Sequence, residues 1–340
     1  MTENNDIFLR KVLVTGGAGC IGMHVCAELS KRGIVPRLFD LGEQIARVSA
    51  DIPTGVEVFY GSVLDRTSVR DAVKGCDAVI HLAAYLGVRR TEQNRLRCFD
   101  INVNGTNHVL ESAAEHGVKR LVFASSSEVY GEPLTTPVSE SAPVNPQSVY
   151  AVTKLAGEEL CKAYHQRYPE LSYVILRYFN AYGPFQTAEF VIPRFIFNVQ
   201  RDVPPVVYGE GDQLRSYCYA TDVAWATVES VGRGEADSQV LNVGNSVEAV
   251  SLMQLADLVI NQAGKKEKLT PQRRGDFQDA DRDASREIHR RSCDSSKAQS
   301  LLGFVAKVTL EEGIEKMLAS GKIFERWAAP GFPYTQDELE

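Results

Sequence analysis

The sequence has no apolar stretch long enough to cross a lipid bilayer. No segment approaches the run of about 18 uninterrupted apolar residues that a membrane-spanning helix requires, and residues 1–10 are mostly polar. We therefore expect no signal peptide, no membrane span and a cytoplasmic location.

Paired cysteines and excess positive charge are also lacking. The seven cysteines are odd in number and show no CxxC spacing, so we expect reduced thiols and neither a disulfide framework nor a metal site. The net charge is −7, with acidic and basic residues interspersed along the chain. Because nucleic acids and anionic membranes call for a basic face, we expect neither as a partner.

The first half of the chain alternates short apolar runs with longer amphipathic segments. The runs at 11–15, 35–39, 56–59, 78–82, 120–124 and 173–178 predict strands, and the segments at 20–32, 98–116 and 147–168 predict helices. Strands that alternate with helices form a parallel sheet covered on both faces. The sequence therefore predicts an α/β fold with a doubly wound parallel sheet.

Beyond Asn180 the pattern changes, because prolines and glycines divide the chain into short elements. The 340 residues suffice for one large domain and a smaller one, and we place the smaller, C-terminal domain mainly at 181–325. An apolar run at 239–243 predicts a late strand that rejoins the first sheet. The charge-rich segment 265–294 predicts a loop, and segments 1–9 and 330–340 predict tails.

A glycine triplet between the first strand and the first helix indicates a dinucleotide site. Gly16 suits a tight turn, Gly19 lets the backbone approach a pyrophosphate, and Gly22 lets the helix pack closely. Asp40 ends the second strand, where a carboxylate binds the ribose hydroxyls and repels a 2′-phosphate. We therefore expect NAD in preference to NADP, although Arg37 nearby leaves NADP open.

A second pattern carries catalytic chemistry. Tyr150 and Lys154 are four residues apart, so in a helix they share a face, and the ammonium is expected to lower the pKa of the phenol. Tyr150 would then serve as a base. Ser126 follows an apolar strand, where its hydroxyl can bind the substrate oxygen that Tyr150 deprotonates.

Together these motifs resemble the NDP-sugar epimerase/dehydratase family of extended short-chain dehydrogenases/reductases. The motifs occur in the family's order: TGGAGCIG (15–22), HLAA (81–84), INVNGT (101–106), SSSEVYG (125–131), YAVTK (150–154) and RYFNAYGP (177–184). The resemblance implies a Rossmann domain over 10–180, a substrate-binding domain over 181–325, bound NAD, a nucleotide-diphosphate sugar as substrate, and a homodimer.

The resemblance also assigns residues to roles. The implied catalytic residues are Ser126, Tyr150, Lys154 and Glu128. The implied cofactor contacts are Gly16, Gly19, Cys20, Ile21, Gly22, Asp40, Ser62, Val63, Leu82, Ala83, Ala84, Asn102, Tyr150, Lys154 and Tyr178. The implied substrate contacts are Tyr85, Ser126, Ser127, Asn180, Arg215 and Arg273.

Three positions depart from the family pattern or leave it ambiguous. Ser62 stands where many members have an aspartate that contacts adenine, and Phe190 stands where many have a substrate-binding asparagine. The late arginine of the family matches either Arg273 or Arg291.

Several activities are compatible with these residues. We expect a UDP-hexose 4-epimerase that works through a 4-keto sugar. The alternatives are a UDP-uronic acid decarboxylase or 4-epimerase, an NDP-hexose 4,6-dehydratase, and a non-catalytic NAD-sensing regulator. Ser127 replaces the aspartate of common 4,6-dehydratases.

Glu128 bears on the choice between neutral and acidic sugars. Its charge is expected to repel a uronate carboxylate, which favours a neutral sugar. Arg89 offsets that charge if it enters the pocket, and in an alternative interpretation Glu128 only caps backbone N–H groups of its turn.

Overall fold

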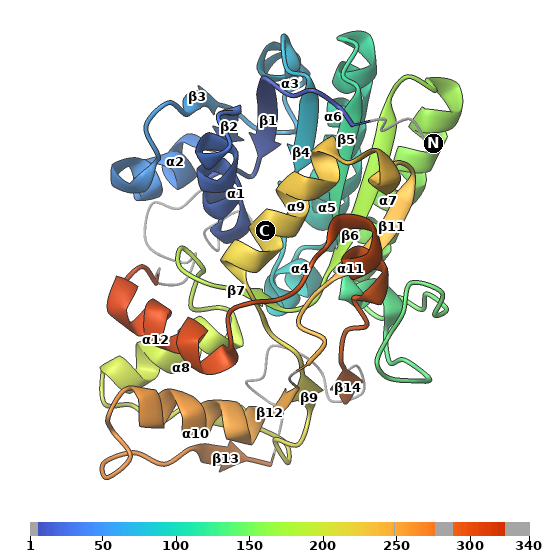
Figure 1. Ribbon diagram of the computed structural model, residues 1–340. Coiled ribbons are helices and arrows are strands. Elements are labelled where there is room, and N and C mark those ends of the chain that lie inside the picture. The colour runs from blue at the N-terminus through green and yellow to red at the C-terminus, as the bar shows by residue number, and fades with distance from the viewer. Residues whose placement is uncertain (1–5, 248, 276–287, 324–340) are drawn as a thin grey trace.

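The computed structural model describes residues 6–247, 249–275 and 288–323, and a seven-stranded parallel sheet forms its centre (Figure 1). The strand order is β11-β6-β5-β4-β1-β2-β3. The bounds are β1 (Lys11–Thr15), β2 (Val35–Asp40), β3 (Glu57–Tyr60), β4 (Ala78–His81), β5 (Arg120–Ser126), β6 (Ser172–Tyr178) and β11 (Gln239–Val243). The predicted strands are confirmed within two residues at each end, and the late strand rejoins the sheet beside β6.

Helices cover both faces of this sheet. One face carries α1 (Cys20–Lys31), α2 (Gly42–Val48), α9 (Ala220–Gly232) and α11 (Ser296–Leu302), with the short helix η1 (Ser49–Asp51) after α2. The other face carries α3 (Arg66–Val73), α5 (Arg95–Phe99), α6 (Gly105–Glu115) and α7 (Val149–Arg167). Val12 and Val14 pack toward the first face and Leu13 toward the second, which is why β1 is apolar throughout.

The predicted helix over 98–116 is interrupted. The structure has α5, then the π-helical turn η2 (Asp100–Asn104), then α6. A π turn inserts one residue into the helix and changes the direction of its side chains, and it is common at functional sites. The segment therefore begins earlier than predicted and carries a bulge at Asn102.

A smaller lobe lies below the sheet in Figure 1 and has its own apolar core. Its helices are α8 (Val191–Gln200), α10 (Leu252–Gln262) and α12 (Leu310–Ser320). Its short strands are β8 (Val206–Tyr208), β9 (Leu214–Arg215), β10 (Cys218–Tyr219), β12 (Val250–Ser251), β13 (Gln272–Arg274) and β14 (Arg290–Arg291), and β7 (Ala181–Tyr182) pairs with β10. The predicted loop 265–294 thus contains two strands, while 276–287 lies outside the described residues.

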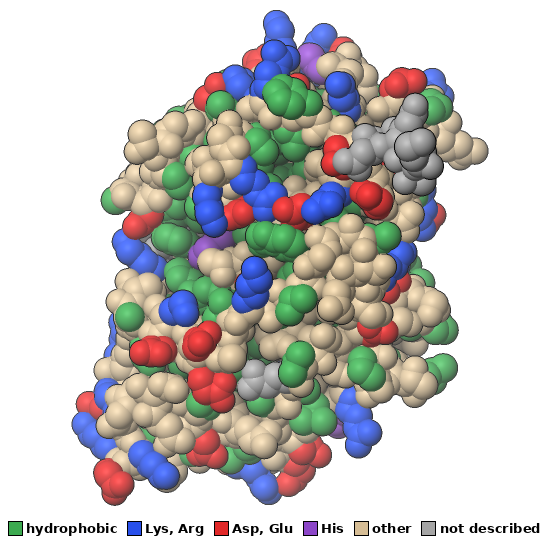
Figure 2. All heavy atoms as spheres, in the orientation of Figure 1, with side chains coloured by type: hydrophobic (Ala, Val, Ile, Leu, Met, Phe, Trp, Pro, Cys, Tyr) green, Lys and Arg blue, Asp and Glu red, His purple; other side chains and the backbone are tan. Residues whose placement is uncertain are grey.

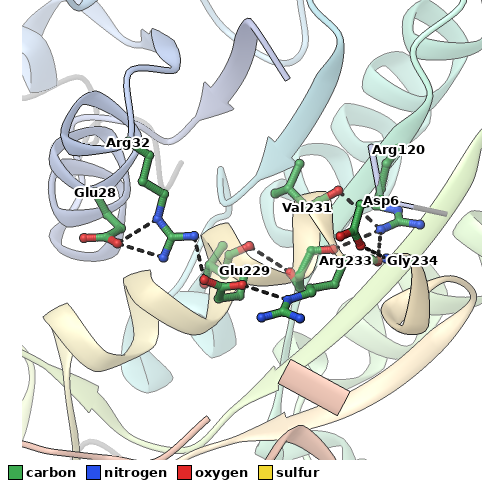
Figure 3. Close-up of polar contacts among 10 residues, drawn as sticks. Asp6, Glu28, Arg32, Arg120, Glu229, Val231, Arg233 and Gly234 are labelled. Carbon is green, nitrogen blue, oxygen red and sulfur yellow. Dashed lines mark hydrogen bonds and ion pairs between the residues drawn. The ribbon is translucent and has the colours of Figure 1, made fainter. Parts of the chain in front are cut away.

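The chain beyond residue 180 returns to the large domain through α9. Arg32, which directly follows α1, pairs with Glu28 of α1 and with Glu229 of α9 (Figure 3). Buried Arg120 of β5 donates to the carbonyl oxygen of Val231. The end of α9 also holds the start of the described chain, because the N–H of Ile7 donates to the carbonyl oxygen of Gly232. Residues 6 and 7 of the predicted tail 1–9 are therefore attached to the fold, and 330–340 lies outside the described residues.

Acidic and basic side chains are interspersed over the face seen in Figure 2. Within the described residues, no helix is both long and apolar enough to cross a membrane. The remaining short helices are α4 (Val88–Gln93), η3 (Ser127–Tyr130) and η4 (Gly234–Ala236).

Candidate active site

The carboxyl ends of the strands and the small lobe enclose a cavity of about 1000 Å³. It lies where the strand order reverses between β1 and β4, which is the usual ligand crevice of such sheets. The cavity brings together most of the residues predicted for the site: Gly16, Gly19, Cys20, Ile21, Gly22, Asp40, Ser62, Val63, Leu82, Ala83, Ala84, Tyr85, Ser126, Ser127, Glu128, Tyr150, Lys154, Tyr178, Asn180 and Arg215. Asn102 and Arg273 do not line it, whereas Arg291 and Arg89 do.

The glycine loop has no room for side chains at two of the predicted positions. Gly16 has a φ of +68°, and a Cβ there would lie 2.7 Å from the N of Ala83. A Cβ on Gly22 would collide with the carbonyl oxygen of Gly16, so Gly22 lets α1 begin directly against the loop. The N-cap, Gly19, provides no side-chain cap. The first N–H groups of α1 are therefore available for an anion such as a pyrophosphate.

Asp40 lies at the end of β2 and lines the cavity. Its Oδ1 accepts from the N–H of Leu41 at 2.8 Å and its Oδ2 from the N–H of Ala18 at 3.0 Å. Burial raises the pKa of Asp40 to about 6, although these two backbone hydrogen bonds lower it. Each oxygen keeps a second lone pair for a ribose hydroxyl, so the carboxylate fits the adenosine end of NAD.

Arg37, because of which NADP remained an alternative cofactor in the sequence analysis, is directed away from this cavity. Its guanidinium pairs with Glu57 at 2.8 Å and donates to the carbonyl oxygens of Ala72 and Lys74. It therefore does not reach a 2′-phosphate on the ribose.

Lys154 is buried one turn further along α7 than Tyr150. Its Nζ donates to the carbonyl oxygen of Ala124 at 2.7 Å and lies 5.7 Å from the centre of the Tyr150 ring. Burial lowers the pKa of Lys154 to about 8. Ser148 caps the start of α7 by accepting from the N–H of Ala151, which fixes the helix end that carries Tyr150.

The expected lowering of the phenol pKa is not found. Burial raises the pKa of Tyr150, and the negative charge of Glu128 raises it further. A hydrogen bond with the side chain of Ser126 and the charge of Arg291 lower it. The prediction was wrong because burial of the phenol raises its pKa, while the Lys154 ammonium bonds to the Ala124 carbonyl. The structure does bring Ser126 and Tyr150 together as predicted.

Glu128 forms an ion pair inside the cavity. Its Oε1 accepts from Nη1 of Arg291 at 2.8 Å, and Nη2 of Arg291 donates to Oδ1 of Asn180 at 3.0 Å. The expected repulsion between Glu128 and a uronate therefore has no basis in this structure, because Arg291 neutralises the carboxylate. The ion-pair partner of Glu128 in this structure is Arg291, whereas the sequence suggested Arg89.

The strand register explains why Arg291 and not Arg273 reaches the site. β14 pairs with β9 in parallel, with Arg291 opposite Arg215, so both side chains leave on the same side. Nη1 of Arg215 donates to the carbonyl oxygen of Leu214 at 2.9 Å. Arg273 lies on β13, pairs with Glu210, and its side chain is 55% exposed. Of the two candidates for the late arginine, Arg291 lines the cavity and Arg273 does not.

Asn102 stands behind the cavity wall. Its Oδ1 accepts from the N–H of Tyr85 at 2.7 Å, and its Nδ2 donates to the carbonyl oxygen of Tyr85 and to Oγ1 of Thr153. The π turn aims Asn102 at these partners. In this structure it orients Tyr85 and holds α7, and it does not face the cofactor side of the cavity.

Two cavity residues escaped the sequence analysis. Gln213 and Gln186 are buried, and Oε1 of each accepts no hydrogen bond from the described residues. A buried acceptor without a donor costs free energy, so such atoms indicate ligand contacts. Gln186 lies two residues past the RYFNAYGP motif, which was the one available signal, and nothing in the sequence distinguished Gln213.

Basic side chains outnumber carboxylates in the cavity wall. The basic ones are Arg89, Arg90, Lys154, Arg194, Arg215 and Arg291, and the carboxylates are Asp40, Glu128 and Glu189. This excess suits polyanionic ligands such as dinucleotides and diphosphates. Among the described residues, no three His, Cys, Asp or Glu side chains cluster in a way that could hold a metal ion.

Relatives of this chain carry out several related reactions. It is 32% identical to a putative UDP-glucose 4-epimerase of Methanocaldococcus jannaschii, covering 90% of this chain and 97% of that protein. It is 31% identical to a UDP-N-acetyl-alpha-D-glucosaminuronate decarboxylase of Bacillus cytotoxicus (91% and 97% covered). It is 33% identical to a dTDP-D-glucose 4,6-dehydratase of Mus musculus (94% and 91% covered).

Solved structures agree in fold. The chain resembles the Thermus thermophilus UDP-glucose 4-epimerase in complex with NAD, with a TM-score of 0.78, 29% identity, and 91% and 98% of the two chains covered. It also resembles the Bacillus cereus UDP-glucuronic acid 4-epimerase in complex with UDP-glucuronic acid and NAD, with a TM-score of 0.80, 28% identity, and 91% and 98% covered. The family model of the NAD dependent epimerase/dehydratase family matches residues 12–244. With its glycine loop, Asp40, Tyr150 and Lys154 in one cavity, this chain belongs to the NAD-dependent epimerase/dehydratase family.

Proposed function

We propose that this protein is a 4-epimerase of a UDP-hexose that works through a transient 4-keto sugar. The observation that carries the proposal is the hydrogen-bonded pair of Ser126 and Tyr150, with Lys154 beside it, in the same cavity as the dinucleotide loop. A hydroxyl bound between Ser126 and Tyr150 is positioned for proton transfer to the phenol.

The protein supplies binding, orientation and proton transfer. NAD, when bound, accepts the hydride from sugar C4 and returns it. Tyr150 takes the proton of the C4 hydroxyl and later gives it back, while Ser126 orients the oxygen. The Nζ of Lys154 lies 5.7 Å from the centre of the Tyr150 ring while it bonds to the Ala124 carbonyl, so its charge acts on the phenol across that distance. Epimerisation requires the 4-keto sugar to present its other face before reduction, and the cavity of about 1000 Å³ leaves room for this movement.

The diphosphate and the base have candidate partners in the small lobe. Arg215 and Arg291 lie side by side on paired strands, and a planar guanidinium binds phosphate oxygens in a bidentate manner. Gln213 follows Tyr208 closely in the sequence and lines the cavity. Its Oε1 accepts no hydrogen bond from the described residues. The N3–H group of uracil or thymine would supply that donor, which supports a pyrimidine nucleotide such as a uridine nucleotide.

The residues that line the cavity give less support to a 4,6-dehydratase. A 4,6-dehydratase must protonate the departing C6 hydroxyl, and Ser127 stands where common members carry an aspartate. Glu128 holds Arg291 through Oε1, and its Oε2 lies 3.5 Å from Oγ of Ser148. This carboxylate is part of the pocket wall rather than an acid dedicated to C6.

A uronate substrate is the second candidate, and the Glu128–Arg291 pair is the observation that favours it. The pair removes the repulsion that argued against a sugar carboxylate, and the wall has an excess of basic groups. Oxidation of a uronate at C4 gives a β-keto acid, which can lose carbon dioxide. Such a substrate would be decarboxylated or epimerised depending on how fast the ketone is reduced.

A non-catalytic NAD-sensing role has weaker support. Such a regulator has no need to keep Ser126, Tyr150 and Lys154 in contact, and here all three meet in one cavity. Fold by itself does not prove activity, so turnover decides this alternative.

We extend the proposal to a homodimer. Leu96 and Phe99 of α5 and Val152 of α7 are exposed apolar residues on neighbouring helices. Exposed apolar side chains on one face favour association with a second copy. Light scattering of the wild-type protein should give twice the mass of one chain. The Leu96→Glu variant should give the mass of a single chain. A monomeric wild-type protein would refute this extension.

The activity is tested with a panel of nucleotide sugars. Purified protein with NAD is incubated separately with UDP-glucose, UDP-N-acetylglucosamine, UDP-glucuronate, dTDP-glucose and GDP-mannose, and products are identified by NMR. We expect a C4 epimer from a neutral UDP-sugar. A pentose product with release of carbon dioxide, formed from the uronate while the neutral sugars stay unchanged, would establish the second candidate instead.

A further inference from the structure

Beneath the catalytic residues lies a fully buried carboxylate to which the reaction above gives no role. Glu158 has 0% exposure and does not line the cavity. Its Oε1 accepts from Oγ of Ser125 and from Nε of Arg177, and its Oε2 accepts from Nη2 of Arg177 at 2.7 Å. A buried ion pair is a costly feature whose stabilising value is low, so its presence calls for another explanation.

Glu158 is placed by the helix that carries Lys154. The two residues are four apart on α7, so both side chains leave the helix on the same face. Gly157 lies between them and packs on Phe123 of β5, where a Cβ would collide with the aromatic ring. Because residue 157 has no side chain, α7 approaches β5 closely enough for Lys154 to reach the carbonyl oxygen of Ala124.

The electrostatic surroundings of Lys154 leave one ionised neighbour. The titratable groups that face it are Tyr150, Glu158 and Cys161 on α7, Cys98 on α5 and His81 on β4. Burial raises the pKa of Cys98, Cys161 and Tyr150, so all three are neutral near pH 7. Burial lowers the pKa of His81 to about 3, so it is neutral too. Of these groups, Glu158 therefore carries the charge that acts on the ammonium.

We propose that Glu158 is a positioning residue that keeps Lys154 protonated in its buried site, and that Arg177 moderates this effect. The geometric basis of this relationship is that both side chains are buried and share one face of α7. Its consequence for turnover rests on the proposed function, because it assumes that the Lys154 ammonium serves Tyr150.

Arg177 links this pair to a second buried contact. Its Nη1 donates to the hydroxyl of Tyr130 at 2.9 Å, and that hydroxyl donates to Oδ1 of Asn242 at 2.7 Å. These bonds fix the guanidinium beside Glu158, and Arg177 does not line the cavity. The positive charge of Arg177 thus partly offsets the negative charge of Glu158 at Lys154. Neutralising Glu158 should lower the Lys154 pKa, and neutralising Arg177 should raise it.

The test is a direct titration of Lys154 that needs neither substrate nor turnover. Protein labelled with ¹³C at lysine Cε is titrated by NMR, and a Lys154→Met spectrum identifies the resonance. We expect the Lys154 pKa to fall below its wild-type value by at least about half a pH unit in Glu158→Gln, and to rise in Arg177→Gln. Glu159→Gln is the matched control, because Glu159 is exposed on the same helix and pairs with Lys162, and we expect no shift.

Neutralising one member of a buried ion pair destabilises a protein, and a single variant that does not fold could not be titrated. A third variant is therefore included. In the double variant Glu158→Gln/Arg177→Gln both charges are removed and two amides can bond each other. We expect the Lys154 pKa to fall there too, because the carboxylate that shares a helix face with Lys154 is lost. A double variant that titrates like the wild type would overturn the proposal, as would shifts of the same sign in both single variants.

Turnover supplies the second arm of the test. With an active sugar, the alkaline limb of the kcat profile should move to lower pH in the double variant, together with the NMR titration. If no sugar is turned over but the NMR shifts are found, the proposed function fails and the role of Glu158 stands. If the sugar is turned over but Lys154 titrates unchanged, the role of Glu158 fails alone.

Discussion

Arg291 lies 2.8 Å from Glu128 in the wall of the cavity, although 163 residues separate them in the sequence. The pair joins η3, which follows the strand of Ser126, to β14 of the small lobe. It also reaches Asn180, so three distant segments meet at one guanidinium. The contact neutralises the one carboxylate expected to select against acidic sugars, and it places a cation where a diphosphate or a sugar carboxylate can bind.

Arg215→Ala should weaken binding of the nucleotide diphosphate whichever sugar it carries. Loss of a hydrogen bond to a charged group costs about 1.5–3 kcal/mol, which corresponds to roughly 10- to 100-fold in Kd. Calorimetric titration with UDP, UDP-glucose and UDP-glucuronate measures the effect. Arg273→Ala is the matched control, because Arg273 lies outside the cavity and should leave all three affinities unchanged. A loss confined to one sugar would place Arg215 at the hexose instead of the diphosphate.

Tyr150→Phe should lower kcat by about 10²- to 10⁴-fold while leaving Kd for the nucleotide sugar nearly unchanged. The ring still packs in its buried place, but the group that takes the C4 hydroxyl proton is gone. Steady-state kinetics and a separate binding titration measure the two quantities. Near-normal turnover in this variant would mean that another residue is the base.

Asp40→Asn should reduce the preference for NAD over NADP. At about 4 Å the repulsion between a carboxylate and a 2′-phosphate is worth ~1 kcal/mol or more, so the affinity ratio should fall at least about fivefold. In the wild type the same preference should depend on pH. The pKa of Asp40 is about 6, so the repelling charge is present above that pH and lost as the pH falls through it. Fluorescence titrations with both cofactors at pH 5 and pH 8 test this, and a ratio independent of pH would contradict the role of Asp40.

Gly22→Ala should damage cofactor binding and stability together. The added Cβ would collide with the carbonyl oxygen of Gly16, and overpacking of this kind costs about 1–3 kcal/mol. Gly42→Ala provides the comparison, since a Cβ there meets only Tyr60 at 3.9 Å. Thermal melts with and without NAD should show a lower Tm and a smaller NAD-induced rise for Gly22→Ala alone. Equal melts for the two variants would show that the loop tolerates a side chain.

The sheet could be predicted from the sequence because its strands are buried on both faces. Such strands appear as short continuous apolar runs, and each predicted run became a strand at nearly the predicted position. The glycine loop and the Tyr150–Lys154 pair were predictable for a similar reason, since their chemistry depends on short local spacing. The π turn at Asn102 was not predictable, because a single extra residue in a helical turn leaves the apolar spacing almost unchanged.

Contacts between distant segments escaped prediction. Arg273 and Arg291 both lie in a charge-rich stretch, and only the pairing of β14 with β9 shows which of them enters the cavity. Glu128 lines the cavity, which agrees with its predicted place in the pocket, but its partner comes from the other lobe. The pKa of Tyr150 was misjudged because the sequence shows a neighbouring lysine but does not show the burial of the phenol or the bond from the ammonium to the Ala124 carbonyl.

The central claim is that hydride leaves and returns at the same sugar carbon. UDP-glucose labelled with deuterium at C4 is incubated with purified protein and NAD, and the products are followed by proton and deuterium NMR. We predict UDP-galactose that retains deuterium at C4. Deuterium recovered at C6 of a 4-keto-6-deoxy sugar would show dehydration and contradict the account, and unchanged UDP-glucose alongside a decarboxylated UDP-glucuronate would contradict it as well.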